Sequence, residues 1–241
     1  MALSTSQWKS IHDFQENELQ RILGDKVFLE SCSRRDHYSR IGQWVDGLGS
    51  RPKVLELGCG PGRYVAFLER LGCDVIGVDP VRYETWGRIS SQSSAQFQDN
   101  VFAENLPFDD GVFVGVACLG AMLYFDKPDK ALAEIRRILR PNGSILLRNV
   151  NSGNLFERFT GRRIDPASRN TYSINALLDL LARSGFQVRD SFSYGFYPPV
   201  FQEYYWYLVN GKISLGFQEL LSAALPSAMR VNHVVFAVKQ D

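Results

Sequence analysis

The sequence predicts an α/β protein with a mostly parallel sheet. Short apolar runs alternate with helical stretches from residue 53 onward. This alternation is typical of a parallel sheet covered by helices on both faces. A glycine-rich turn, Gly58–Gly62, joins the first apolar run to the first helix of this pattern. Neither an internal repeat nor a low-complexity tract divides the chain, so we expect one domain over residues 1–241.

The strands follow from the apolar runs and the turn residues that bound them. Before them, residues 1–50 are polar and helical in pattern, with Leu19, Ile22 and Leu23 on one face, and the turn residues Asp46–Pro52 end this segment. The predicted strands are Lys53–Leu57, Asp74–Asp79, Gln96–Phe102, Val112–Leu119, Ser144–Val150 and a closing strand, Val231–Val238.

Three helices have recognisable ends. The first is Arg63–Leu71, directly after the glycine turn. The second, Asp129–Arg140, carries arginines in its last turns, which suit the negative end of the helix dipole, and we expect Pro141-Asn142-Gly143 to stop it. The third is Ser173–Arg183, with Ser173 as N-cap and Gly185 as the C-terminal stop.

Composition excludes several classes of protein. The formal net charge of +1 gives no field that would favour nucleic acid or an anionic membrane. The four cysteines form neither a C-x-x-C pair nor a cluster with histidine, so we expect no metal site and a reducing cytoplasm. The N-terminal residues lack the pattern of a secretory signal, and no apolar run is long enough to span a membrane.

The segment Val54–Tyr64, V-L-E-L-G-C-G-P-G-R-Y, carries the strongest functional signal. Glycines between a strand and a helix let the backbone approach a ligand closely. Asp79 follows Glu56 by 23 residues, at the end of the second strand, where a carboxylate can hold the hydroxyls of a ribose. The spacing G-x-G-x-G differs from a dinucleotide fingerprint, and Glu56 would repel a pyrophosphate but attract an ammonium. The pattern indicates a nucleoside cofactor that carries a cationic amino-acid group.

Four motifs in order resemble the class I S-adenosylmethionine (SAM)-dependent methyltransferases, over most of residues 51–193. They are E-L-G-C-G-P-G (Glu56–Gly62), G-V-D-P (Gly77–Pro80), A-E-N-L-P-F-D-D-G (Ala103–Gly111) and E-I-R-R-I-L-R-P-N-G-S-I-L-L (Glu134–Leu147). The nearest subgroup resembles the small-molecule methyltransferases of quinone biosynthesis. The resemblance implies a Rossmann-like, doubly wound, seven-stranded sheet with a reversed final strand. It further implies an N-terminal helical cap (1–50), a SAM-binding core (51–193), a helical and aromatic insertion (194–230) and a closing strand (231–241).

The resemblance also implies roles for individual residues. Gly58, Cys59, Gly60 and Gly62 lie against the methionine part of SAM, and Glu56 orders the loop or binds the ammonium. Asp79 binds the ribose. The residues that flank the adenine are Pro80, Ala103 and Glu104, and those that face the sulfonium are Leu119 and Gly120. Tyr38, beside His37, either contacts the cofactor or packs in the core.

Two positions depart from the family pattern. Phe102 stands where an acid usually contacts the adenine amino group, and Val114 stands where an aspartate is common. A non-catalytic interaction module on the SAM fold is therefore the second hypothesis. An NAD-type oxidoreductase is the third, and the glycine spacing and Glu56 disfavour it.

The sequence contains His12, His37 and His233 as candidate general bases, of which His37 lies in the segment that folds over the cofactor in this family. The arginines Arg158, Arg162, Arg163 and Arg169 form either a solvated loop or a grip on an anionic acceptor.

Residues 192–207 hold nine of the chain's thirty aromatic residues, as the wall of an acceptor pocket or as a homodimer contact. The tetrapeptide typical of methylation of nucleic-acid amino groups is missing after the fourth strand. We therefore expect SAM-dependent methylation of a small molecule, at an oxygen of a hydrophobic or aromatic metabolite, with an anionic or saccharide acceptor as the alternative.

Overall fold

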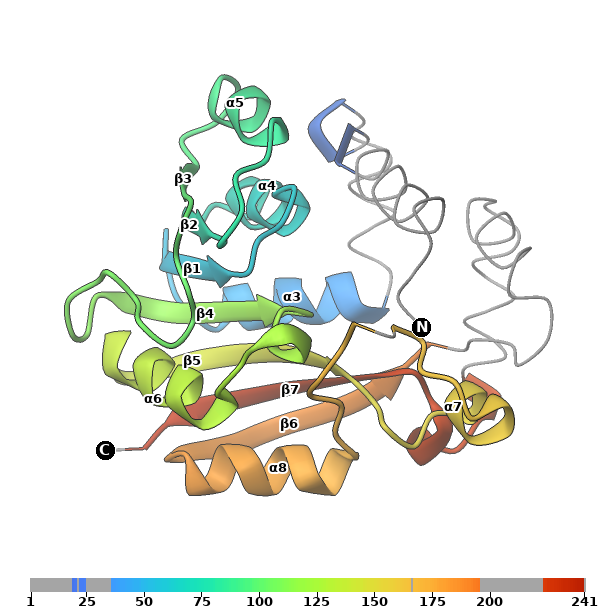
Figure 1. Ribbon diagram of the computed structural model, residues 1–241. Coiled ribbons are helices and arrows are strands. Elements are labelled where there is room, and N and C mark those ends of the chain that lie inside the picture. Colours follow the sequence, from blue (N-terminus) through green and yellow to red (C-terminus); the bar gives the residue numbers. More distant parts are fainter. Residues whose placement is uncertain (1–18, 21, 25–35, 166, 196–222, 241) are drawn as a thin grey trace.

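The computed structural model describes residues 19–20, 22–24, 36–165, 167–195 and 223–240 (Figure 1). One seven-stranded sheet organises them, in the order β3-β2-β1-β4-β5-β7-β6. The strands are β1 (Lys53–Leu57), β2 (Asp74–Val78), β3 (Gln96–Gln98), β4 (Phe113–Leu119), β5 (Leu139–Val150), β6 (Phe186–Tyr194) and β7 (Asn232–Lys239). The helices are α3 (Asp36–Asp46), α4 (Arg63–Arg70), α5 (Thr85–Ser90), α6 (Pro128–Ile138), α7 (Leu155–Thr160) and α8 (Ile174–Arg183), with short 3₁₀ turns η1 (Met122–Tyr124) and η2 (Ser227–Met229).

The predicted fold class is confirmed. Strands β3, β2, β1, β4 and β5 are parallel, whereas β7 is antiparallel to both β5 and β6. The final strand is therefore the reversed one and lies inside the sheet. Most of the N-terminal cap and of the aromatic insertion, including His12 and residues 196–207, lies outside the described residues.

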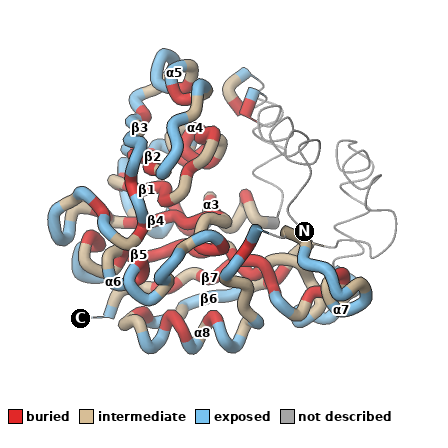
Figure 2. The backbone as a smooth tube through the Cα atoms, in the orientation of Figure 1, coloured by how far each residue is buried: buried red, intermediate tan, exposed pale blue. Residues whose placement is uncertain are grey.

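Alternation along the strands divides the core into two layers, one on each face of the sheet (Figure 2). Leu146 of β5 belongs to the layer covered by α3, α4 and α5. The next residue, Leu147, belongs to the layer covered by α6 and α8. Leu19 and Ile22 of the N-terminal segment are buried in the first layer, and Leu23 packs against it, so the predicted apolar face of that segment is part of this layer, next to α4.

Three predicted boundaries are wrong, and the third is the start of the fifth strand, which is Leu139 and not Ser144. The third strand ends at Gln98 because Asn100 takes a left-handed conformation (φ 56°), and Phe102 forms only an isolated bridge with Asn105. The helix predicted to reach Arg140 ends at Ile138, since Leu139 is already extended and pairs with Phe113 in the sheet.

The Pro141-Asn142-Gly143 turn therefore lies inside β5 and does not end a helix. Ser173 does cap α8, accepting a hydrogen bond from the Ala176 amide, and Gly185 follows it with φ 81°.

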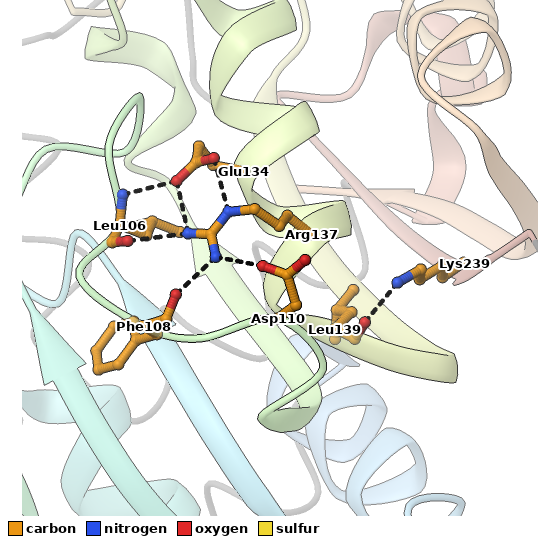
Figure 3. A network of polar contacts seen from close by, with 7 residues as sticks. All are labelled: Leu106, Phe108, Asp110, Glu134, Arg137, Leu139 and Lys239. Atoms are coloured by element: carbon orange, nitrogen blue, oxygen red, sulfur yellow. Dashed lines mark hydrogen bonds and ion pairs between the residues drawn. The ribbon is translucent and has the colours of Figure 1, made fainter.

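The loop between β3 and β4 is held by one arginine of α6 (Figure 3). Arg137 donates to the carbonyl oxygens of Leu106 (3.0 Å) and Phe108 (2.6 Å). It also pairs with Glu134 (2.9 Å) and Asp110 (2.8 Å). The hydrogen bond from Arg137 is the main reason why the pKa of Glu134 is lowered. This clamp fixes the segment that resembles the family's third motif.

Among the helices of the described residues, none is long and apolar enough to cross a membrane.

Candidate cofactor and acceptor site

The sheet order changes direction between β1 and β4, and a crevice at such a point is where open α/β sheets bind ligands. The glycine turn lies there, at the carboxyl end of β1. The amides of Gly58 and Cys59 both donate to the carbonyl oxygen of Val78, at 2.8 and 3.0 Å. A Cβ atom at Gly58 (φ 70°) would lie 2.1 Å from the Cβ of Ala121 in the loop after β4. Only glycine leaves the two loops this close.

Asp79 ties the end of β2 to the same turn. Its Oδ2 atom accepts a hydrogen bond from the Gly60 amide at 2.9 Å, and its Oδ1 atom accepts one from the Val81 amide at 3.0 Å. A carboxylate offers about four acceptor positions, so roughly two remain for the hydroxyls of a ligand. Burial raises the pKa of Asp79, while the two amides oppose that shift.

Two side chains of the α5 region brace the turn from outside. Trp86 Nε1 donates to the Gly60 carbonyl oxygen, and Thr85 Oγ1 donates to that of Pro61, both at 2.7 Å. The Trp86 ring stacks on Phe97 of the neighbouring strand, with centroids 5.0 Å apart. The backbone of the turn is therefore fixed before any ligand binds.

Glu56 is a buried acid, 1% exposed, directly below the turn. Burial raises its pKa well above the ordinary value of 4.5, although Arg148 and Arg63 attract the ionised form. Its Oε2 atom has no hydrogen-bond partner within the described part of the chain. An acid held in this way is suited to bind an ammonium group, which would favour ionisation and supply the missing donor.

Comparisons with known proteins agree with this geometry. Residues 55–147 match the family model described as a methyltransferase domain. Residues 55–147 therefore form a methyltransferase domain. An uncharacterized methyltransferase of Mycobacterium tuberculosis is 31% identical over 134 residues, which are 48% of this chain and 54% of that protein. A ubiquinone biosynthesis O-methyltransferase of Pseudomonas aeruginosa is 26% identical, over 45% of this chain and 49% of the relative. The chain thus spans about half the length of the curated relatives it matches.

Solved structures share the fold of the methyltransferase domain at low identity. The 1,6-didemethyltoxoflavin-N1-methyltransferase of Burkholderia thailandensis, with 1,6-didemethyltoxoflavin and S-adenosylhomocysteine bound, aligns with a TM-score of 0.60. It is 20% identical and covers all of this chain and 92% of its own. The YcgJ protein of Bacillus subtilis aligns with a TM-score of 0.61, at 19% identity over 85% of this chain and all of its own. Residues 55–147 thus carry the methyltransferase family predicted from the four motifs, and the neighbour with bound S-adenosylhomocysteine agrees with the predicted SAM cofactor.

The methyltransferase domain brings most of the predicted cofactor residues to one edge of the sheet. Leu119 and Gly120 end β4, next to the turn that carries Gly58 and Gly62. Ala103 is buried on the loop held by Arg137, whereas Pro80 is exposed. Glu104 accepts a hydrogen bond from the Lys127 amide at 3.0 Å, so part of this carboxylate is used to fix the loop before α6.

Other predicted residues turn out to pack or to lie in solvent. Tyr38 is fully buried, and its ring packs on Tyr64 and Phe67, which is the packing role that competed with a cofactor contact. The Cys59 thiol is buried, and burial raises its pKa, so it is a poor nucleophile. Phe102, at the position of the missing acid, is 55% exposed.

The candidate general bases and the arginine cluster lie in different parts of the structure. His37 stacks on Tyr194 with centroids 5.1 Å apart, at the end of β6. His233 is fully buried on β7, with Nδ1 2.7 Å from the hydroxyl of Ser193, and burial lowers its pKa to about 4. Arg163 and Arg169 bond to Ser168 and Asp126, and Arg158 and Arg162 are exposed. The solvated-loop interpretation of the cluster fits these positions.

Sequence reasoning missed Arg148, on β5. Its Nη2 atom donates to the Leu119 carbonyl oxygen at 3.1 Å, and its Nη1 atom lies 3.5 Å from the Tyr194 hydroxyl. Burial acts to lower the pKa of this guanidinium, but Tyr64 and Tyr194 raise it, so the charge is kept. An arginine directly after the apolar run Ile145–Leu147 was the signal that could have revealed it.

Sequence reasoning also missed a hydrogen-bonded pair, Tyr124 and Asp165, of which Tyr124 lies on the loop after β4. The Tyr124 hydroxyl donates to the carboxylate of Asp165, and the Tyr124 side chain is 46% exposed beside the site. Burial and Asp165 raise the pKa of Tyr124, so this phenol stays protonated. It is a hydrogen-bond donor and not a base in this arrangement.

Proposed function

We propose that this chain transfers a methyl group from SAM to a small-molecule acceptor, at an oxygen of a hydrophobic or aromatic metabolite. The observation that carries the proposal is the convergence of Glu56, the Gly58–Gly62 turn and Asp79 at the neighbouring carboxyl ends of β1 and β2. The buried Glu56 Oε2 atom, which has no hydrogen-bond partner among the described residues, fits the ammonium of SAM, and the free acceptor positions of Asp79 fit its ribose.

The chain's own residues bind, orient and exclude water. Glu56 holds the amino-acid end and Asp79 the ribose, so that Leu119 and Gly120 face the sulfonium. When bound, SAM supplies an electrophilic methyl group. Since no covalent activation is required, the rate comes from holding the acceptor oxygen in line with that methyl, about 3 Å away, in a site closed to water.

We further propose the predicted organisation: a single domain in which residues 1–50 form a cap, 51–193 the SAM-binding core and 194–230 an acceptor lid or dimer insertion, closed by 231–241. The position of β7 between β5 and β6 supports one domain, because removing this strand would split the sheet.

Thermal unfolding with saturating SAM, S-adenosylhomocysteine and NADH tests the cofactor. A ligand at 100 times its Kd adds about 2.7 kcal/mol, which corresponds to roughly 5–11 °C for a domain of this size. We expect both SAM species to raise Tm and NADH to leave it unchanged. No shift with either SAM species would refute the proposal.

A panel of hydroxylated and amino-substituted aromatic compounds then tests turnover. Release of S-adenosylhomocysteine and the mass and fragmentation of the product identify methylation of oxygen. Phe102, exposed in place of an acid, favours a second candidate, the non-catalytic interaction module. Tight SAM binding without turnover on the panel would support that candidate.

A further inference from the structure

Arg148 places a positive charge beside the expected reacting atoms. It lies near the carboxyl end of β5, and its side chain shares the face of Leu146, under α3 and α4. The side chain is partly exposed, and its Nε atom has no hydrogen-bond partner among the residues that the structure describes. A guanidinium with five donors is thus only partly satisfied by the protein.

The strand order fixes where this charge lies relative to the proposed cofactor. Along the carboxyl edge of the sheet, β2 carries Asp79, β1 carries Glu56, β4 carries Leu119, and β5 carries Arg148. The ribose therefore belongs at β2, and the sulfonium at β4. The next strand in the row, β5, borders the acceptor side.

The guanidinium also touches the residue expected to face the sulfonium. A Cβ atom at Gly120 (φ 111°) would lie 2.5 Å from Arg148 Nη2. Glycine at this position is what lets the guanidinium lie against the backbone of the β4 loop. The cation consequently stands at the end of β4, next to the expected place of methyl transfer.

Two positive charges so close together repel each other in a site closed to water. Glu56 attracts Arg148, but in the proposed complex its carboxylate is committed to the ammonium of SAM. An anionic group between the sulfonium and the guanidinium relieves the repulsion and supplies acceptors for the unfilled donors. Aromatic side chains lie beside the guanidinium, since the Tyr64 centroid lies 6.0 Å from Arg148 Cζ and the Tyr194 hydroxyl lies 3.5 Å from Arg148 Nη1.

We propose that Arg148 is a specificity-determining residue that selects an acceptor bearing an anionic oxygen, as a carboxylate or an ionised phenol or enol on a flat apolar body. The inference rests on the proposed function and adds the charge of its substrate. A lone pair of the anionic oxygen forms the O–CH3 bond as the C–S bond breaks, and the bonding pair stays on sulfur. The products are a neutral thioether and a neutral ester or ether. No proton moves, so a general base is not needed.

Matched anionic and neutral probes test the proposal. Benzoate against benzamide, and cinnamate against cinnamamide, are titrated by calorimetry into protein saturated with S-adenosylhomocysteine. The wild-type chain should bind each anion about 10- to 150-fold more tightly than its amide, the range for a hydrogen bond to a charged group. In Arg148→Gln the preference should fall below threefold, and Arg148→Lys should recover part of it. Arg189→Gln, which removes an exposed positive charge on β6, is the control and should keep the preference.

Each result decides the question. Equal binding of anion and amide by the wild-type chain, or binding of neither pair, overturns the inference. So does an Arg148→Gln variant that retains the preference. Loss of S-adenosylhomocysteine affinity in Arg148→Gln, with Arg189→Gln unaffected, would assign Arg148 to the cofactor carboxylate and also overturn it. The proposed function fails separately, if the wild-type chain binds neither SAM nor S-adenosylhomocysteine.

Discussion

Replacing Asp79 by alanine separates its role in the fold from its role toward the cofactor. In the free protein its carboxylate bonds to the amides of Gly60 and Val81. In the proposed complex it also accepts the ribose hydroxyls. Asp79→Ala should therefore reduce stability and cofactor affinity together, and the two effects must be measured apart.

The magnitudes follow from these contacts. Loss of a hydrogen bond between the ribose and a charged acceptor costs about 1.5–3 kcal/mol, or roughly 10- to 150-fold in Kd. The Gly60 contact has the same range, whereas the exposed Val81 contact contributes less. Burial raises the pKa of Asp79, so alanine also removes a desolvated charge, which offsets part of the loss. We expect the free energy of unfolding to fall by no more than about 3 kcal/mol, or about 12 °C in Tm.

Two ligands distinguish direct contact from a disturbed loop. Calorimetry with S-adenosylhomocysteine and with its 2′,3′-dideoxy analogue is performed on the wild-type chain, Asp79→Ala and Asp74→Ala. Asp74 is exposed at the opposite end of β2 and serves as the control. The substitution at Asp79 should weaken the natural ligand about 10- to 150-fold and the dideoxy analogue less than threefold. Equal losses for both ligands would show that Asp79 acts only through the glycine turn, and unchanged affinity would refute the assignment.

Three further predictions concern the fold. His233 is buried with a pKa of about 4 against 6.5 when unfolded, so the unfolded state binds the proton first. Stability should fall by about 3 kcal/mol as pH drops from 6.5 to 4, and His233→Gln should flatten that part of a pH series of urea melts. Ser144→Ala should cost about 1–3 kcal/mol in the same melts, because it leaves the buried Trp44 Nε1 atom without its 2.8 Å acceptor. Arg137→Met should cost about 1.5–3 kcal/mol and increase hydrogen exchange over residues 104–111, whereas an unchanged exchange pattern would contradict the clamp.

Much of the fold could be predicted from local patterns. Buried parallel strands are short apolar runs, and the Ser173 cap and Gly185 stop are encoded within a few residues of α8. The end of α6 could not be predicted in this way. Arg136, Arg137 and Arg140 continue a helical pattern, but pairing of the buried Leu139 with Phe113 draws the chain into β5 two residues earlier. A contact across 26 residues of sequence thus overrides the local preference.

The candidate site also has a part that local sequence predicts and a part that depends on the pairing of distant strands. Glu56, the glycine turn and Asp79 lie within 24 residues, and one strand–turn–helix–strand unit places them together. Arg148 and Tyr194 lie near these residues only because of the strand order. That order places β5 beside β4, and it places β6 next to β7 on the other side of β5. No spacing in the sequence predicts that arrangement, because it depends on which strands pair: β4 with β5 for Arg148, and the reversed β7 with β5 and β6 for Tyr194.

The glycine turn and Arg148 differ in how many backbone contacts fix them, so substitutions at the two places should have different effects. The residues proposed to hold the cofactor are bound to one another by short backbone contacts, such as those of Val78 with Gly58 and Cys59, so a substitution there also strains the fold. Arg148 has a single backbone contact, to Leu119, and an unfilled Nε atom within the described residues. A change at Arg148 therefore alters the charge of the acceptor side at low cost to the turn. Acceptor choice and cofactor binding are therefore coupled through the charge attraction between Arg148 and Glu56, but the contacts that fix the two sides belong to different parts of the sheet.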